Sequence, residues 1–452
     1  MTKPKFLSTA LLLVLLLAGG LRLMMVVLQS DQLQEDRDAY IAIAVNLASG
    51  NGYSSGNAAI VDGIEPTAFR PPLYPCLLAA LYYVKAGSLG VGLLQVLLGV
   101  LTVWFTWKTG LRLRMPVGAL VAAAIVATDP VLLQYTSYAM TEVLSAFLTS
   151  LLIYMLALNL TEETTLPDTP EKAFRTFATG LVWGLAILCR PTYLAFFGLW
   201  FLASLCNPVL KRILNTPSKG LVWRQRTYLS AGILIAVSPW LIRNLVVFHA
   251  PILTTTHGGY TLLLGNNPVF YQEVVQQPWG TVWSGESLDA WQKSLEREIE
   301  NTIPPVKSEQ ERDRWMYQRA KANIAADPSL FVQSCLLRLR RFWNFSPLNS
   351  SLVESKPLIG WGITGYYLLI LTGAGAGVLL LTWKRESGWG PIIWLVFSFT
   401  AVHLFYWTNM RMRAPLVPAI ALLSVYGWSK SMEFLKLRKP IATREQESHN
   451  TL

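Results

Sequence analysis

The residues QSDQLQEDRDAYIAIAVNLASGNGYSSG at positions 29–56, followed by TAFRPPLYPCL at positions 67–77, organise the whole chain. This stretch lies between two apolar segments that are long enough to cross a bilayer. Carboxylates at membrane depth are costly and usually face a polar cavity or a partner charge. We therefore interpret the stretch as the first outer loop of a membrane protein, and as the first place to look for its chemistry. Its carboxylates are Asp31, Glu35, Asp36 and Asp38.

The composition defines the class of protein. Of the 452 residues, 52% are hydrophobic and 14% are charged, whereas soluble domains average roughly 25% charged residues. The chain is therefore predicted to be a polytopic membrane protein. Its net charge of +11 would suit nucleic acid, but the basic residues lie in short loops between apolar runs, which is typical of the positive-inside rule. The cysteines show no CxxC or Cys/His spacing and predict neither a disulfide framework nor a metal cluster; they are Cys76, Cys189, Cys206 and Cys335.

Ten apolar runs approach the roughly 20 residues that cross a bilayer as a helix. The first run is too long for a signal peptide and no small-residue cleavage site follows it, so we expect an uncleaved span. The segment Leu73–Val84 is apolar but too short to span, and we expect an interfacial helix there. The ten predicted spans are Phe6–Leu28, Leu89–Trp107, Val117–Thr128, Thr141–Asn159, Phe174–Leu188, Thr192–Cys206, Tyr228–Val247, Gly360–Trp383, Pro391–Trp407 and Pro415–Trp428.

The distribution of basic residues predicts the orientation. With the N-terminus in the cytoplasm, the basic residues fall on alternate loops, as the positive-inside rule requires. Both termini are then cytoplasmic, and the first loop is extracytoplasmic. The basic residues concerned are Lys3, Lys5, Lys108, Arg112, Arg114, Lys172, Arg175, Lys211, Arg212, Lys219, Arg224, Arg226, Lys384, Arg385, Lys430, Lys436, Arg438, Lys439 and Arg444.

This topology divides the chain into an N-terminal transmembrane module (1–247, with its outer loop at 29–88), an extracytoplasmic segment (248–359), C-terminal transmembrane helices (360–430) and a cytoplasmic tail (431–452). The extracytoplasmic segment contains SEQERDRWMYQRAKANIAADPSLFVQSCLLRLRRFW, which predicts two helices separated at Asp327–Pro328. The second helix has an apolar side, so we expect it to lie in the interface with its cations at phosphate depth. Those cations are Arg338, Arg340 and Arg341.

Charged side chains gather at the outer ends of the predicted spans. A cavity with carboxylates near one wall and arginines near another suits transfer from a phosphate-linked donor. One carboxylate can deprotonate the attacking hydroxyl, while the arginines, with or without a divalent ion, neutralise the departing phosphate. The residues are Asp36, Asp38, Arg70, Glu142, Arg190, Arg243, Arg411 and Arg413.

The chain resembles a known superfamily through an ordered series of motifs. EDRDAYIAIAVNLASGNGY followed by FRPPLYP is similar to the first outer loop of bacterial dolichyl-phosphate-mannose-protein mannosyltransferase-like proteins, a superfamily that includes lipid A aminoarabinose transferases. YTSYAMTEVLSAFL, ILCRPTYL, SPWLIRNLVVF, LLLGNNP and MRMRAPLVP follow in the order that these proteins show. The resemblance covers most of the chain. It implies the all-α GT-C fold of membrane glycosyltransferases, with about ten transmembrane helices, interfacial helices in the first loop and a mostly helical extracytoplasmic segment.

The resemblance also implies an activity: inverting transfer of a sugar from a polyprenyl-phosphate donor to a hydroxyl of a lipid, glycan or protein on the extracytoplasmic face. The catalytic Asp of the superfamily stands four residues before a Tyr, which here makes it Asp36, with Asp38 as the near alternative. The metal-binding acid of the superfamily has no counterpart beside Arg70, since Glu65 lies five residues earlier, so the metal requirement stays open. The residues expected to bind the donor phosphate or substrate are Arg70, Tyr74, Glu142, Arg190, Arg243, Asn244, Arg411 and Arg413.

Structural alternatives remain for these residues. Asp36 and Asp38 could only cap the amphipathic helix expected at Tyr40–Ala48, and Glu142 could only begin a helix. His249 and His257 are expected to be polar loop residues, with a role as metal ligands as the alternative. A transporter or flippase of a lipid-linked anionic glycan is the alternative function, although a transporter should show paired halves with broken helices. A scaffold would leave the outer arginines unexplained. The sequence does not name the sugar or the acceptor.

Overall fold

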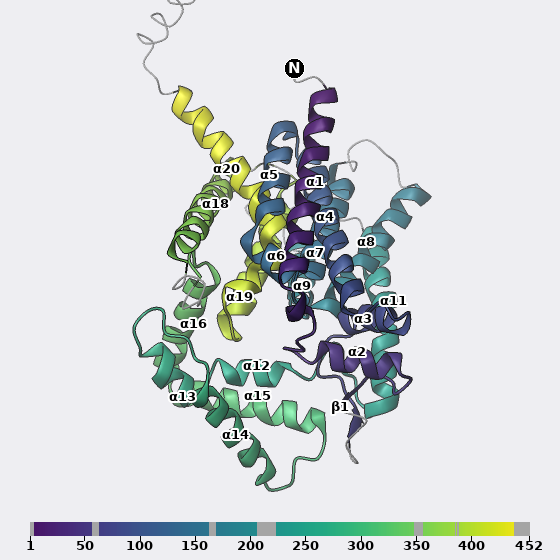
Figure 1. Cartoon of the computed structure of the whole chain (residues 1–452), viewed down its shortest axis with the longest axis vertical. Coiled ribbons are helices and arrows are strands. Elements are labelled where there is room, and N and C mark those ends of the chain that lie inside the picture. The colour runs from purple at the N-terminus through teal and green to yellow at the C-terminus, as the bar shows by residue number, and fades with distance from the viewer. Residues whose placement is uncertain are drawn as a thin grey trace, which may run out of the picture.

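The computed structural model describes residues 4–56, 63–161, 169–205, 223–347, 356–384, 386 and 388–437. Figure 1 shows a bundle of long helices with a layer of shorter helices across one end. The start of α1 (Pro4–Leu28) and the end of α20 (Val417–Leu437) lie at the opposite end of the bundle. The residues of the topology argument that lie outside the described ranges are Lys3, Cys206, Lys211, Arg212, Lys219, Arg385, Arg438, Lys439 and Arg444.

Each of the ten predicted spans corresponds to a helix of the bundle. In the described part of the chain, six of these helices are long and apolar enough to cross a membrane. They are α1 (Pro4–Leu28), α4 (Gly87–Arg112), α7 (Glu142–Thr161), α8 (Pro170–Cys189), α11 (Trp223–Phe248) and α18 (Pro357–Lys384).

The remaining helices of the bundle are shorter or carry charges. Three of them have 13, 14 and 16 residues, fewer than the roughly 20 that a bilayer requires. A proline stands in the first turn of α5 and α19, where the missing backbone N–H has no partner to lose. The helices are α5 (Pro116–Thr128), α6 (Pro130–Tyr135), α9 (Thr192–Leu205), α19 (Gly390–Phe405) and α20.

Glycines let α8 and α11 pack backbone against backbone. A Cβ atom at Gly180 would lie 2.1 Å from the carbonyl oxygen of Leu229, and one at Gly232 would lie 2.2 Å from that of Phe177. Small residues at membrane helix contacts allow this close approach, which increases van der Waals contact where lipid provides no hydrophobic driving force. The contact holds together the two helices whose outer ends carry Arg190 and Arg243.

The first outer loop contains the two predicted helices and a small sheet that the sequence did not predict. The helix α2 (Tyr40–Ala48) has the predicted bounds, and α3 (Leu73–Tyr83), with 11 residues, is too short to span, as expected. Between them, β1 (Ser54–Gly56) and β2 (Ile64–Pro66) pair in antiparallel orientation. The loop is therefore a folded unit beside the bundle (Figure 1).

The extracytoplasmic segment folds into helices with a core of their own. The predicted break at Asp327–Pro328 is confirmed: the Asp327 side chain accepts the Leu330 N–H at 2.9 Å and caps the second helix. Ser308 and Glu311 form a capping box at the start of the first. The elements are α12 (Gly258–Leu264), α13 (Pro268–Phe270), η2 (Tyr271–Val275), α14 (Glu286–Glu300), α15 (Glu309–Ala326) and α16 (Pro328–Phe342).

The arginines of α16 do not all point to lipid phosphates, which corrects the prediction. Arg338 is buried and donates to the carbonyl oxygens of Leu404, at 2.6 Å, and Gly265. Arg341 is buried and donates to the Thr281 carbonyl. The exposed Arg340 lies 3.7 Å over the Trp279 ring. Two of the three cations therefore satisfy backbone carbonyls inside the protein.

Candidate functional site

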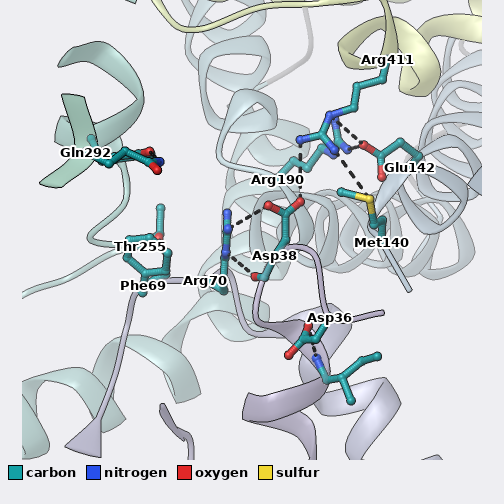
Figure 2. Close-up of polar contacts among 12 residues, drawn as sticks. Asp36, Asp38, Phe69, Arg70, Met140, Glu142, Arg190, Thr255, Gln292 and Arg411 are labelled. Atoms are coloured by element: carbon teal, nitrogen blue, oxygen red, sulfur yellow. Dashed lines mark hydrogen bonds and ion pairs between the residues drawn. The ribbon is translucent and has the colours of Figure 1, made fainter. Parts of the chain in front are cut away.

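Five charged side chains meet where the bundle faces the outer layer. Glu142 is the first residue of α7, and Arg190 follows the end of α8. Arg411 stands on the short 3-10 helix η3 (Met410–Leu416). Asp38 and Arg70 come from the first outer loop, just before α2 and α3 respectively. We call Asp38, Arg70, Glu142, Arg190 and Arg411 the charged cluster (Figure 2).

Glu142 holds two arginines of the charged cluster together. Its carboxylate lies 2.8 Å from the Arg190 guanidinium and 3.8 Å from that of Arg411. Arg190 also donates to the Thr141 hydroxyl at 3.0 Å, and Arg411 contacts the Met140 sulfur at 3.6 Å. Because Glu142 is fully buried, it depends on these cations for the stability of its charge.

Asp38 connects Glu142 and its arginines to Arg70. The Arg70 guanidinium donates to the Asp38 backbone carbonyl at 2.7 Å and to its carboxylate at 3.0 Å. The other carboxylate oxygen of Asp38 lies 3.7 Å from Arg411. Arg70 is further fixed by the rings of Tyr40 and Phe69, whose centroids lie 5.4 and 4.9 Å away. Asp38 therefore stands between two guanidinium groups that approach it from different elements.

The charged cluster is suited to an anion. Its three guanidinium groups face two carboxylates, which leaves one positive charge in excess. The side chains of Asp38 and Arg411 remain 21% and 26% exposed, so a ligand can reach them. Among the described residues, Glu142 Oε2 and Arg411 Nε are buried without a hydrogen-bond partner. Guanidinium groups arranged in this way bind phosphate through charge-assisted hydrogen bonds.

Asp36 has a different position from Asp38. Its two carboxylate oxygens accept the backbone N–H groups of Ile41, at 2.9 Å, and Ala42, at 2.7 Å. Ala39, just before α2, has a φ of 60°, which turns the chain so that Asp36 reaches the helix start. Asp36 is exposed and, in the described part of the chain, forms no ion pair. It therefore caps α2, while Asp38 points into the charged cluster (Figure 2).

Tyr74, Arg243 and Asn244 lie around the first loop instead of in the charged cluster. Tyr74 is fully buried beneath Tyr40, with ring centroids 5.4 Å apart. Arg243 donates to the carbonyl oxygens of Thr67 at 2.9 Å and of Tyr53 at 2.6 Å. Asn244 donates to the Ile252 carbonyl at 2.9 Å. These side chains hold the loop against α3 and α11.

Arg413 is only two residues from Arg411 but belongs to a second group of charges. It is buried, donates to the Phe342 carbonyl at 3.1 Å and lies 4.3 Å over the Tyr367 ring. Tyr367 donates in turn to the Asp129 carboxylate at 3.2 Å. Asp129 also accepts the N–H of Leu132 at 2.9 Å.

Arg22 of α1 completes this second group of charges. It is fully buried and donates to the carbonyl oxygens of Val126 and Ala127, just before Asp129. Neither Arg22 nor Asp129 was predicted to have a role, although an arginine inside the first apolar run is a visible signal, because a charge there needs a partner. We call Arg22, Asp129, Tyr367 and Arg413 the sealed network.

The charged cluster does not fit a divalent cation. Both of its carboxylates already face guanidinium groups, and its excess charge is positive. No group of three His, Cys, Asp or Glu side chains with metal-site geometry occurs among the residues that the structure describes. His257, one candidate ligand, lies against Phe69 and Tyr260. Burial, and then the nearby Arg70, lowers the pKa of His257 well below its usual value.

Comparisons with known proteins agree with this architecture. The sequence profile of the dolichyl-phosphate-mannose-protein mannosyltransferase family matches residues 69–242. No curated protein sequence matches the chain. The resemblance inferred from the sequence is thus confirmed over that range.

Solved structures share the fold at low sequence identity. The archaeal oligosaccharyltransferase AglB from Archaeoglobus fulgidus, in complex with an inhibitory peptide and a dolichol-phosphate, is 12% identical and matches with a TM-score of 0.51 over 99% of this chain and 52% of its own. An Archaeoglobus fulgidus oligosaccharyltransferase tethered to an acceptor peptide is also 12% identical and gives a TM-score of 0.52 over 96% and 50%.

ArnT from Cupriavidus metallidurans bound to undecaprenyl phosphate is 14% identical over 87% of this chain and 73% of its own, with a TM-score of 0.37. The chain spans about half the length of the two oligosaccharyltransferase structures. The predicted GT-C fold is confirmed.

Proposed function

We propose that this chain, with its GT-C fold and its match to the mannosyltransferase family over residues 69–242, is a membrane glycosyltransferase. It moves a hexosyl or pentosyl group from a polyprenyl-phosphate donor to a hydroxyl of a lipid, glycan or protein acceptor. The observation that carries this proposal is the charged cluster, an open group of three arginines and two carboxylates at one end of a membrane bundle. The dolichol-phosphate, a polyprenyl phosphate, in the AglB structure supports the donor class.

The donor phosphate binds at Arg411 and Arg190. The Arg411 side chain is 26% exposed and that of Arg190 is 13% exposed, so a phosphate can reach Arg411 first. Glu142 keeps both guanidinium groups at the membrane boundary. As the bond between sugar and phosphate breaks, negative charge grows on the phosphate, and fixed cations stabilise that charge most in the transition state.

Asp38 is the general base in this proposal. A base must lie within hydrogen-bond reach of the acceptor hydroxyl while the phosphate is held nearby, and Asp38 lies 3.7 Å from Arg411. Asp36 is the position that the family pattern favours, but both of its carboxylate oxygens accept hydrogen bonds from backbone N–H groups of α2. We therefore assign the base to Asp38, oriented by Arg70, and assign Asp36 to the cap of α2.

The reaction follows from these positions. The acceptor hydroxyl gives its proton to Asp38 while its oxygen forms a bond to the anomeric carbon. The bond from that carbon to the phosphate oxygen breaks, and its electron pair leaves with the polyprenyl phosphate. Because the acceptor attacks from the side opposite the departing phosphate, the anomeric configuration is inverted.

The site belongs on the extracytoplasmic face of a cell inner membrane, with both termini in the cytoplasm. Two observations support this orientation. The start of α1 and the end of α20 both lie at the end of the bundle opposite the outer layer (Figure 1). The positive-inside rule places the basic loops at that same end.

The proposal is tested with purified full-length protein in lipid nanodiscs and a panel of polyprenyl-phosphate sugars, with membrane extract as the source of acceptors and with or without EDTA. We expect release of polyprenyl phosphate from one donor. Arg411→Gln should reduce it about 100-fold, the order expected when a transition-state donor is lost. Arg340→Gln, at an exposed arginine on α16, is the matched control and should leave release unchanged.

Two results would overturn the proposal. If the protein binds a donor tightly but releases no polyprenyl phosphate from any member of the panel, it is a transporter of lipid-linked anions. If Arg411→Gln and Arg340→Gln behave alike in a protein that does release it, the phosphate binds away from the charged cluster.

A further inference from the structure

A group of uncharged side chains lies next to the charged cluster, on the side of Arg70 that faces away from Asp38. Phe69 precedes Arg70 in the first loop, His257 and Tyr260 stand at the start of α12, and Gln292 lies on α14. The Phe69 and His257 rings meet edge to face with centroids 4.3 Å apart, and His257 stacks on Tyr260 at 5.3 Å. Gln292 donates to the Tyr260 hydroxyl at 2.7 Å. We call Phe69, His257, Tyr260 and Gln292 the aromatic surface.

The aromatic surface is firmly connected to the element that carries Arg70. The Thr256 N–H donates to the Ala68 carbonyl at 3.0 Å, and the Thr255 hydroxyl donates to the Phe69 carbonyl. Glu309, at the start of α15, accepts the Ala68 N–H at 3.0 Å and the hydroxyls of Thr67 and Thr256. The loop and the outer segment are therefore locked together beside Arg70.

The position of the aromatic surface relative to the charged cluster is defined by Arg70. The Arg70 guanidinium lies 4.9 Å from the Phe69 ring centroid on one side and 3.0 Å from the Asp38 carboxylate on the other. Figure 2 shows Gln292, Thr255 and Phe69 on one side of Arg70, and Glu142, Arg190 and Arg411 on the opposite side beyond Asp38. Asp38 thus lies between the proposed phosphate site and the aromatic surface.

The polar groups of the aromatic surface are neutral. Burial, and then Arg70, lowers the pKa of His257 well below its usual value, so its ring is uncharged at neutral pH. Within the described chain, His257 Nδ1 is buried without a hydrogen-bond partner. Because Gln292 donates to the Tyr260 oxygen, the Tyr260 hydroxyl hydrogen and the Gln292 carbonyl oxygen stay available. The aromatic surface can therefore donate and accept hydrogen bonds without presenting a charge.

We propose that the aromatic surface binds a neutral sugar ring of the acceptor. A sugar ring presents an apolar C–H face that packs on aromatic rings and hydroxyls that pair with amide, imidazole and phenol groups. Inverting displacement also requires the acceptor to approach from the side opposite the phosphate, and the aromatic surface lies on that side of Asp38. This inference rests on the proposed function and adds to it a substrate class: an acceptor that carries a sugar.

The test uses full-length protein in nanodiscs and saturation-transfer NMR with a panel of neutral methyl hexopyranosides and methyl pentopyranosides. We expect transfer to the C–H protons of at least one glycoside, reduced about tenfold by Tyr260→Leu, since losing a ring contact and a hydrogen bond amounts to about 1.4 kcal/mol. Tyr260→Phe keeps the ring and should lose only part of the signal. Trp279→Leu, at a partly exposed tryptophan of the outer segment, is the matched control.

A second arm identifies the source of the sugar. Binding of the polyprenyl-phosphate donor should be unchanged in Tyr260→Leu if the aromatic surface holds the acceptor. Weaker donor binding in that variant would assign the surface to the donor sugar and overturn the inference. Equal glycoside signals in Tyr260→Leu and the wild type would also overturn it, as would the absence of any glycoside signal from the wild type. Release of polyprenyl phosphate, measured separately, reports on the proposed function itself.

Discussion

The charged cluster and the sealed network are built from similar parts. Each has an acid at the start of a helix, Glu142 for α7 and Asp129 for α6, and each receives an arginine from η3. Each also contains a buried arginine nitrogen without a hydrogen-bond partner in the described chain. They differ in access: Arg411 is 26% exposed, whereas Arg413 is 1% exposed.

This difference shows that the burial of a charged side chain does not by itself identify a functional site. Charges inside a membrane protein are expensive and so attract attention as functional sites. In the sealed network, however, the cost is offset by backbone carbonyls, a tyrosine hydroxyl and opposite charges, and no surface is left for a ligand. Access to solvent, together with a charge excess, separates a binding site from a structural ionic network.

The largest expected effect comes from replacing Asp38, the proposed base in the charged cluster. Asp38→Asn should reduce turnover about 10²- to 10⁴-fold, the usual contribution of general base catalysis, as measured by release of polyprenyl phosphate. Asp36→Asn keeps an acceptor for the α2 amides and should stay within a few-fold of the wild type. The reverse order, with Asp36→Asn inactive and Asp38→Asn active, would return the base to Asp36.

The second-largest effect is expected when Asp129, the carboxylate of the sealed network, is replaced. Asp129→Asn removes the charge that accepts hydrogen bonds from Leu132 and Tyr367 beside two buried arginines, and losing hydrogen bonds to a charged group costs about 1.5–3 kcal/mol. Denaturant titration of the protein in detergent should show that loss of stability. Glu142→Gln is the companion variant: its arginines can reach water or Asp38, so the loss should be smaller. Equal losses of stability in the two variants would mean that access to solvent does not distinguish the charged cluster from the sealed network.

A smaller effect is expected at Asp36, where a carboxylate lies outside both groups. Asp36→Ala removes the acceptor for two amides of α2, and the loss of a helix cap costs about 1 kcal/mol. Hydrogen exchange at Ile41 and Ala42 should become faster, while the amides of α16, whose cap is Asp327, should exchange as before. Unchanged exchange at Ile41 would mean that the cap contributes nothing.

The smallest expected effect concerns a carboxylate that forms no ion pair within the described chain. Burial, and then the nearby Glu309, raises the pKa of Asp313 to about 6, against the hydrogen bond from Gly259. Folding therefore takes up a proton between about pH 4 and pH 6, and the free energy of unfolding falls as the pH rises through that window. Because Asp313 is only half-buried, we expect a loss of less than about 1 kcal/mol. Thermal unfolding of the wild type and Asp313→Asn should show it, since the variant should lack this pH dependence.

The sequence was sufficient for features that depend on local patterns. Apolar runs predicted the helices of the bundle, amphipathicity predicted α2, and the Asp327–Pro328 pair predicted the break before α16, because helix length, amphipathicity and capping are properties of neighbouring residues. The sheet of β1 and β2 was missed, since its two strands have only three residues each.

The roles of neighbouring charges could not be predicted in the same way. Arg411 and Arg413 both belong to MRMRAP, and only their partners on distant elements send one to Glu142 and the other to the Phe342 carbonyl and the Tyr367 ring. Asp36 caps α2 and Asp38 reaches Arg70 and Arg411, because the chain turns at Ala39, whose φ of 60° the sequence does not reveal. Arg243 lies at the outer end of a predicted span, where an anion ligand is expected. Its guanidinium N–H groups instead donate to backbone carbonyl oxygens of the first outer loop.

The order in which the charged cluster's residues occur along the chain has a consequence for biosynthesis. Glu142 and Arg190 come from adjacent helices, α7 and α8, and can pair while the ribosome is still translating the middle of the chain. Asp38 emerges before them, but Arg411 follows only after α18 and α19 have been made. The cluster therefore gains its excess positive charge late, when η3 docks beside α7. Until then a nascent chain holds Asp38, the proposed base, without Arg411, the proposed ligand of the donor phosphate, so the proposed activity requires an almost complete translation product.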